Sequence, residues 1–130
     1  MTQKLAQVAL VVRDYDEAIR FYTDILKFEL VEDTLLSPSK RWVIVQPPGT
    51  SGCRLLLAKA VGEEQVSRIG NQTGGRVFLF IHTDNFQGDY EFLKKKGVKF
   101  VREPSREPYG TVAVFADLYG NLFDLIEPTQ

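Results

Sequence analysis

The alternation of apolar and polar positions along the chain predicts the same series of elements twice. In the first half, a valine-rich run predicts a strand buried on both faces over 4–13, helical spacing predicts a helix over 15–26, and shorter runs predict strands over 28–33, 41–46 and 54–59. The second half predicts a strand over 77–82, a helix over 85–96 and strands over 98–102, 111–116 and 121–127. Asp14 and Asp84 are equivalent in this pattern and lie 84 − 14 = 70 positions apart. The chain is therefore an internal repeat of two modules.

Residues at the ends of these elements support their boundaries. Asp14 is expected to cap the first helix together with Glu17, and Asp84 to cap the second. Pro104 and Pro108 are expected to break the second half in a loop, and the sequence at 119–121 predicts a tight turn between strands. The polar, glycine-rich stretch 61–75 separates the modules, with one helical turn expected at 63–68.

These elements predict an α+β fold. We expect two βαβββ modules, over about 4–60 and 76–130, joined by the linker 61–75 within one domain of 130 residues. Two curved mixed sheets arranged in this way are expected to surround a cleft that strands of both modules line.

Composition excludes several classes of partner. Sixteen basic and 17 acidic residues give a formal charge of −1, and the only basic cluster is 94–96 at a helix end, so nucleic acid is not expected. No stretch approaches the about 20 apolar residues that span a bilayer. Cys53 is the single cysteine, which favours a reducing, cytoplasmic location and a small buried hydrophobe rather than a nucleophile.

Two stretches carry a resemblance to a known family. VALVVRDYDEAIRFYTDILKFELVED at 8–33 and VAVFADLYGNLFDLIEP at 112–128 resemble the vicinal oxygen chelate superfamily of glyoxalase I, bleomycin resistance proteins and extradiol dioxygenases. One departure is Lys27, where the family commonly has glycine. The resemblance covers nearly the whole chain. It implies the paired-module fold, and it leaves open several metal-dependent activities as well as simple drug sequestration.

The resemblance also implies positions for the family's metal ligands. Catalytic members hold a divalent ion with one side chain from each of four strands, and these positions fall on Gln7, Leu56, Arg76 and Asp124. Leu56 has no donor atom, and the permanent positive charge of Arg76 repels a cation. The usual metal quartet is therefore not expected, and an ion held by Gln7, Asp124 and His82 is the alternative.

Arg76 and Asp124 suggest what replaces the metal. Because the two positions converge in this family, we hypothesise a guanidinium–carboxylate pair whose positive end binds an anionic or carbonyl-bearing small molecule. The competing interpretation is a salt bridge that only satisfies two buried charges.

Other candidate residues surround this position. Period-two alternation places Phe78, Phe80 and His82 on the face of Arg76, and Val77, Leu79 and Ile81 on the helix side. The two phenylalanines are expected either to stack on a ligand or to fill the core, and His82 either to act as a base or ligand or to be exposed at a strand end. Further candidates at the rim of the site are Trp42, Gln46, Arg54, Glu107 and Tyr109.

The sequence therefore favours one function over two others. The expected function is small-molecule binding in the manner of bleomycin resistance proteins, in a homodimer, without the usual metal quartet. The first alternative is a metal-dependent lyase, isomerase or dioxygenase-like enzyme of the glyoxalase type with unusual ligands. The second is a module that regulates a partner and whose cavity is filled by its own side chains.

Overall fold

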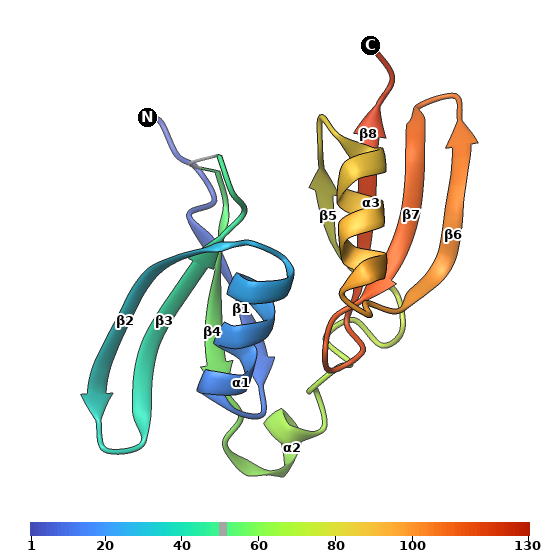
Figure 1. The fold of residues 1–130 in the computed structure, drawn as a ribbon. Helices are drawn as coiled ribbons and strands as arrows, with labels where there is room; N and C mark the ends of the chain where they lie inside the picture. Colours follow the sequence, from blue (N-terminus) through green and yellow to red (C-terminus); the bar gives the residue numbers. More distant parts are fainter. Residues whose placement is uncertain (50–51) are drawn as a thin grey trace. The chain divides into compact units, whose positions relative to one another are not determined.

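The computed structural model describes residues 1–49 and 52–130, and these form two compact units, Met1–Ile69 and Gly70–Gln130 (Figure 1). The boundary between the units falls inside the stretch 61–75 that the sequence marks as the join between modules. We describe each unit by itself.

Unit 1 contains a mixed four-stranded sheet in the order β1-β4-β3-β2. β1 and β4 pair in parallel, and the other neighbours are antiparallel. Its elements are β1 (Gln7–Val12), α1 (Tyr15–Arg20), the π-helix η1 (Phe21–Ile25), β2 (Glu29–Ser37), β3 (Lys40–Gln46), β4 (Arg54–Lys59) and the short α2 (Gly62–Val66).

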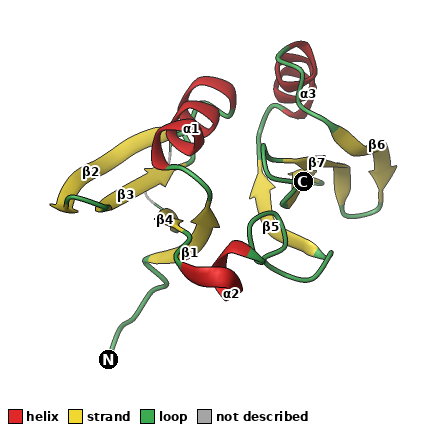
Figure 2. Cartoon of the chain, turned by 90° about the horizontal axis from the view of Figure 1, so that it is seen from below, coloured by secondary structure: helices red, strands yellow, loops and turns green. Residues whose placement is uncertain are grey.

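Helix α1 covers one face of the unit 1 sheet (Figure 2). Tyr15 and Arg41 fix this arrangement, because the Tyr15 hydroxyl accepts a hydrogen bond from the Arg41 backbone N–H at 3.2 Å. The Arg41 guanidinium also lies over the Tyr15 ring and pairs with Asp33 and Asp16. The hydrogen bonds to Arg41 hold the pKa of Asp33 below its usual value. The core on this side consists of Leu10, Val12, Ala18, Tyr22, Val43, Val45, Leu55 and Leu57.

Unit 2 repeats the same topology, with the sheet order β5-β8-β7-β6. β5 and β8 are parallel, and β8 with β7 and β7 with β6 are antiparallel. Its elements are β5 (Val77–His82), α3 (Phe86–Lys95), β6 (Phe100–Glu107), β7 (Gly110–Ala116) and β8 (Leu122–Pro128). The α+β fold of two βαβββ modules is confirmed.

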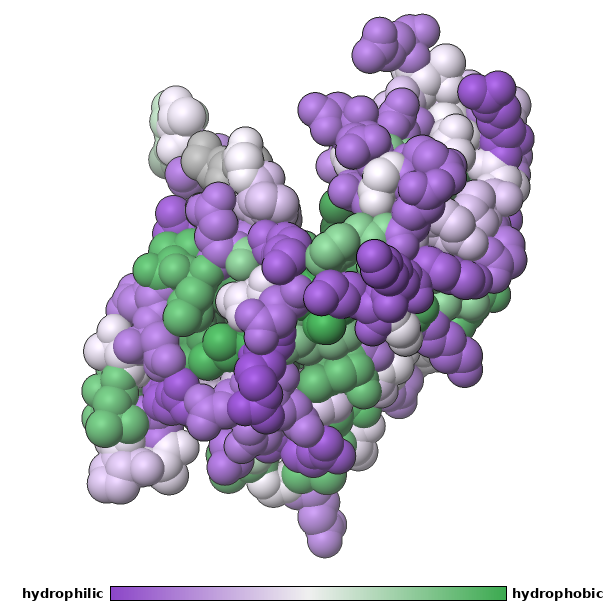
Figure 3. Space-filling view, viewed as in Figure 1, coloured by the Kyte–Doolittle hydropathy of each residue, from purple (hydrophilic) through white to green (hydrophobic). Residues whose placement is uncertain are grey.

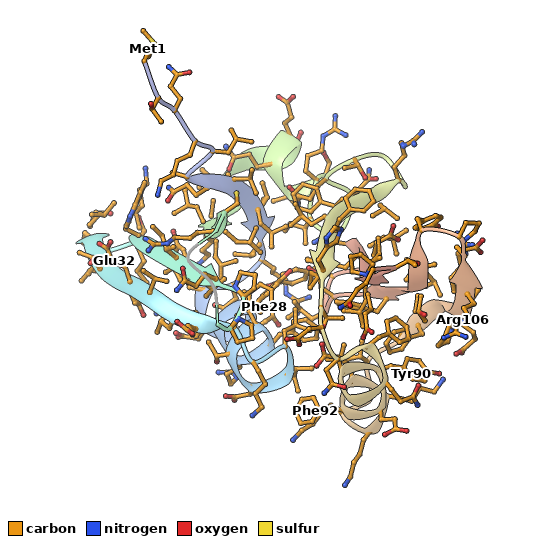
Figure 4. All side chains as sticks on the ribbon, turned by 90° about the horizontal axis from the view of Figure 1, so that it is seen from above. Met1, Phe28, Glu32, Tyr90, Phe92 and Arg106 are labelled. Carbon is orange, nitrogen blue, oxygen red and sulfur yellow. The ribbon has the colours of Figure 1, made fainter. Side chains whose placement is uncertain are left out.

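A series of aromatic rings joins α3 to the unit 2 sheet. Tyr90 reaches from α3 towards β6 (Figure 4), where its ring meets Phe100 edge-on at 4.8 Å between centroids. Phe100 contacts Phe115 at 5.9 Å, and Phe115 stacks on Phe123 at 5.2 Å. Phe115 and Phe123 are fully buried, so this side of the sheet forms the core of the unit.

The caps of the two helices differ in how well the sequence predicted them. The Asp14 carboxylate accepts a hydrogen bond from the Glu17 N–H at 2.9 Å, which confirms the first cap. For α3 the prediction of Asp84 was wrong, since the N-cap is Asn85, whose side chain accepts from the Gly88 N–H at 3.3 Å. The Thr83 hydroxyl accepts the Asn85 N–H, which starts the helix one residue later.

Three other expectations were wrong. Pro104 does not break the chain, because it lies within β6 at an edge of the sheet, where the pairing with β7 is irregular between Arg102 and Ser105. β1 is not buried on both faces, since Ala9 is exposed between its buried and half-buried neighbours. Cys53 is exposed rather than buried, because it precedes β4 instead of lying inside it.

Within the described residues, none of the helices has both the length and the apolar character needed to cross a membrane.

Candidate functional site

A row of polar side chains crosses the unit 1 sheet on the face opposite α1. We call this face the α1-distal face. Its residues alternate along the strands with those that face α1, and all except the buried Ile44 are half-buried or exposed: Gln7, Ala9, Val11, Trp42, Ile44, Gln46, Arg54, Leu56 and Ala58. The row begins with Gln7 on β1, which pairs in register with Arg54 on β4. Arg54 Nε donates to Gln46 Oε1 at 3.1 Å, and Gln46 Nε2 donates to Glu29 Oε2 at 3.1 Å. Four strands thus contribute to one polar row.

Arg54 is held by this row but is not neutralised by it. Its side chain is half-buried, and its Nε is satisfied by a neutral amide oxygen rather than by a carboxylate. Within the described part of the chain, its two Nη groups have no hydrogen-bond acceptor and no ion-pair partner. A guanidinium fixed at Nε with both Nη groups available presents donors that match a carboxylate or carbonyl group.

Apolar side chains adjoin the polar row on the same face. Ala9, Leu56 and Ile44 lie in register across β1, β4 and β3, each two residues along its strand from the polar row. Trp42 is half-buried two residues further along β3. The α1-distal face therefore combines a polar end with an apolar and aromatic surface, which is the composition of a typical small-molecule site.

Unit 2 has its charges in the middle of the corresponding face. We call it the α3-distal face; across it Arg102, Val114, Asp124 and Phe80 lie in register on β6, β7, β8 and β5. Asp124 is half-buried and has no hydrogen-bond partner among the described residues, while the Phe80 side chain is 63% exposed. Burial raises the pKa of the Asp124 carboxyl, and the positive charge of Arg102 lowers it to a smaller extent.

Arg76 does not occupy the position that the sequence hypothesis gave it. It precedes β5, its side chain is exposed, and it forms no ion pair with Asp124. The expectation that Val77 lies on the helix side was wrong. A register shift between Val77 and Leu79 interrupts the alternation, and Val77 pairs with Leu122, which shares the face of Asp124 in β8. The cation that acts on Asp124 is Arg102 instead.

The remaining candidates lie at strand ends or in turns. His82 is exposed at the end of β5, on the α3-distal face with Phe80, while Phe78 is half-buried at the register shift. Tyr109 is 59% exposed in the turn between β6 and β7. Glu107 accepts a hydrogen bond from Ser105, so it belongs to the surface of β6.

The residues at the family's metal positions do not fit a divalent ion. Leu56 lies on the α1-distal face with only carbon atoms in its side chain, and Arg76 brings an exposed positive charge. Gln7 supplies one amide and Asp124 one carboxylate. Among residues 1–49 and 52–130, no group of three or more His, Cys, Asp or Glu side chains is placed to hold a metal.

Sequence reasoning missed two functional candidates. Glu29 ends the polar row, and its Oε1 also accepts the Gly49 N–H at 3.4 Å. Arg102 faces Asp124 across Val114. The apolar–polar alternation of β2 and β6 could have indicated both faces, but the register shifts in these strands hide which residues share them.

Comparison with known proteins places the chain among related folds. The model of the Glyoxalase/Bleomycin resistance protein/Dioxygenase superfamily matches residues 4–125. An uncharacterized protein of Shewanella frigidimarina is 58% identical over 128 residues, which are 98% of this chain and 95% of that protein. The crystal structure of UcmS2 has a TM-score of 0.85 and 34% identity, covering 98% of this chain and 99% of that one. TnmS3, an antibiotic binding protein from Streptomyces sp. CB03234, has a TM-score of 0.77 and 25% identity, covering 99% and 98%.

Proposed function

The chain belongs to the Glyoxalase/Bleomycin resistance protein/Dioxygenase superfamily, and from this premise we propose that it binds and sequesters a small, flat, largely apolar molecule bearing a carboxylate or carbonyl group. The ligand is held without the metal quartet of the catalytic members. The α1-distal face carries the site, and Arg54 anchors the ligand's polar group.

The observation that supports this proposal is the state of the Arg54 guanidinium. It is oriented by Gln46, yet no carboxylate neutralises it among the described residues. A half-buried guanidinium with unused donors gains more from a ligand carboxylate than a fully solvated one does, because the surrounding protein screens the charge less than water.

The apolar surface beside Arg54 supports a flat ligand. Leu56 offers a half-buried aliphatic side chain, and Trp42 offers an aromatic ring with a polar N–H. Leu56 stands at a family metal position, so an aliphatic side chain replaces a donor there. TnmS3, which is similar over 99% of this chain, is described as an antibiotic binding protein, and we extend that class of ligand to this chain as part of the proposal.

Matched naphthalene probes test the role of Arg54. Isothermal titration calorimetry would compare 2-naphthoate with neutral 2-naphthylmethanol against the wild-type protein and Arg54→Gln. We expect Arg54→Gln to lower the affinity for 2-naphthoate about tenfold and the affinity for the alcohol much less, because only the carboxylate interacts with the charge that is removed. Trp42 is the only tryptophan, so a change in its emission reports binding near this face.

Arg20→Gln is the matched control. Arg20 is an exposed arginine in the last turn of α1, so the variant removes the same charge from the other side of unit 1. Its affinity for 2-naphthoate is expected to equal that of the wild type. Equal losses for both probes in Arg54→Gln would remove Arg54 from the site, and no binding by either probe would contradict the proposed function.

Metal analysis separates this proposal from the enzyme of glyoxalase type. Protein purified without chelator is expected to contain no stoichiometric divalent ion, because Leu56 and Arg76 cannot ligate one. One bound ion per chain would favour a lyase or isomerase with unusual ligands instead.

We further propose that two copies of the chain associate as a homodimer through β2. Leu30, Val31, Leu35 and Leu36 are all exposed on this edge strand, and Figure 3 shows apolar surface near the tip of the β2–β3 hairpin. We also propose a cytoplasmic location, since Cys53 is an exposed free thiol and such thiols persist in reducing compartments.

A further inference from the structure

We propose that Asp124 and Phe80 form a second recognition point, on the α3-distal face, for the positively charged nitrogen of an amine-bearing aromatic molecule. This inference rests on the proposed function only in assuming that the chain binds small aromatic molecules. It concerns residues of unit 2 and does not depend on Arg54.

The position of Asp124 in its strand exposes its carboxylate to a ligand. β8 lies between β5 and β7, and its neighbours Phe123 and Leu125 are buried on the α3 side. The side chain of Asp124 therefore projects from the opposite face. It is half-buried there and has neither a hydrogen-bond donor nor an ion-pair partner within the described residues. A partly buried carboxylate without donors is costly unless something else supplies them.

The contrast with Asp33 shows that Asp124 does not belong to a structural ion pair. Asp33 is bonded to the Arg41 guanidinium at 2.7 Å, and its pKa is lowered as expected of a satisfied carboxylate. At Asp124 burial outweighs the more distant charge of Arg102, and the pKa is raised. The carboxylate is therefore under-compensated, and an additional cation beside it is favourable.

Phe80 supplies the second half of the recognition point. It pairs in register with Asp124 on the neighbouring strand, and 63% of its surface is exposed although it lies within β5. An ammonium group next to the carboxylate also approaches the face of this ring, which attracts cations. A carboxylate beside an aromatic ring therefore favours an aromatic amine ligand over a metal ion, because the ring adds no donor atom for a metal.

The internal repeat shows that the fold does not require these residues. In unit 1 the row that corresponds to Arg102, Val114, Asp124 and Phe80 consists of Glu32, Ile44, Leu56 and Ala9. The same topology thus forms with leucine and alanine in place of the aspartate and phenylalanine. The carboxylate and the exposed ring are features of unit 2 alone.

A matched probe pair tests the inference. 2-Naphthylmethylammonium and neutral 2-naphthylmethanol share one ring and differ in charge, and calorimetry would give both affinities. We expect the wild-type protein to bind the ammonium more tightly, and Asp124→Asn to lower that affinity about tenfold while leaving the alcohol nearly unchanged. Phe80→Leu is expected to lower the affinity for the ammonium probe several-fold.

Two further variants separate recognition from structure. Arg102→Gln is expected to tighten ammonium binding a few-fold, because it removes the competing positive charge; a residue needed only for folding would not have this effect. Asp84→Asn removes an exposed carboxylate of the same unit and is expected to leave the affinity for both probes unchanged.

The outcomes distinguish this inference from the proposed function. If the ammonium binds no better than the alcohol, or if Asp124→Asn behaves like Asp84→Asn, the inference is overturned while binding of 2-naphthoate at Arg54 still stands. If the Asp124 variant shows the expected effects but Arg54→Gln does not change the affinity for 2-naphthoate, the inference is supported and the role of Arg54 as an anchor is contradicted. If no naphthalene probe binds the wild-type protein, both are overturned.

Discussion

Lys27 has a backbone conformation that glycine adopts most easily. Its φ is +62°, and it is the only non-glycine residue with positive φ among the described residues. It follows Leu26, the C-cap of η1, and the Phe28 N–H bonds back to the Tyr22 carbonyl at 2.8 Å. This turn needs a left-handed residue after the helix. The lysine noted in the sequence where relatives commonly have glycine is therefore a strained position rather than a change of fold.

Substitutions at Lys27 should rank by their tolerance of positive φ. Lys27→Gly is expected to preserve or slightly raise the free energy of unfolding, because the strain relieved is offset by the greater chain entropy of glycine. Lys27→Val is expected to lower it by about 1–2 kcal/mol, since a β-branched residue tolerates this conformation worst. Chemical denaturation measures all three proteins.

Lys99→Val is the control for this series. Lys99 is exposed and has an ordinary backbone conformation, so the same change of side chain is expected to cost less than about 0.5 kcal/mol. A Lys27→Val protein as stable as Lys99→Val would show that the turn relaxes without strain.

Arg54 and Arg76 show why the sequence did not single out Arg54 among the candidate residues. The sequence places both arginines next to strands and cannot say which guanidinium is half-buried and oriented by a neighbouring strand. That distinction depends on Gln46, which meets Arg54 only after β3 and β4 pair. It also depends on the register shift between Val77 and Leu79, which separates Arg76 from the regular alternation of β5.

The first helix shows a limit of periodicity at the scale of an element. The sequence predicts one helix over 15–26, but the structure changes from α to π at Phe21. The Thr23 hydroxyl donates to the Ile19 carbonyl at 2.7 Å, and the Leu26 N–H reaches five residues back to Phe21. A side-chain hydroxyl that competes for a helix carbonyl widens the turn locally. Apolar spacing alone does not reveal such a competition.

The N-terminus of α3 allows a test of which residue caps the helix. Asn85→Ala is expected to lower the free energy of unfolding by about 1 kcal/mol, because the Gly88 N–H loses its acceptor. Asp84→Ala is expected to cost less than half as much, since Asp84 is exposed and lies one residue before the cap. Thermal or chemical denaturation of the two variants in parallel gives the comparison. If Asp84→Ala is the more damaging change, the assignment of the cap to Asn85 is wrong.

The repeat made the architecture predictable for the whole molecule, while the details of the site were not. Strands 54–59 and 77–82 were placed with their observed limits, because each is a short apolar run bounded by polar or glycine residues. β2 and β6 extend well beyond the predicted strands 28–33 and 98–102, since both form long hairpins at sheet edges. The polar row and the pairing of Asp124 with Phe80 depend on register between strands far apart in the sequence, which no local pattern encodes.

The edge strands β2 and β6 differ in how well they are protected against pairing with strands of other molecules. β6 contains Pro104 and charged residues on either side of it, a composition that prevents strands of other molecules from adding to an edge. β2 occupies the equivalent edge of unit 1 over nine residues without a proline, and Leu35 and Leu36 are 68% and 53% exposed. Of these two edges, β2 is the one suited to pairing with a second copy of the chain.

Lysines on β2 should therefore dissociate the proposed homodimer. We expect the wild-type protein to be a dimer by light scattering after size exclusion, and Leu35→Lys/Leu36→Lys to be a folded monomer, because a two-fold interface brings like charges together. Val101→Lys is the control, since Val101 is an exposed apolar residue of β6 and its replacement should leave the dimer intact. A monomeric wild-type protein, or a dimer lost through Val101→Lys instead, would show that β2 does not form the interface.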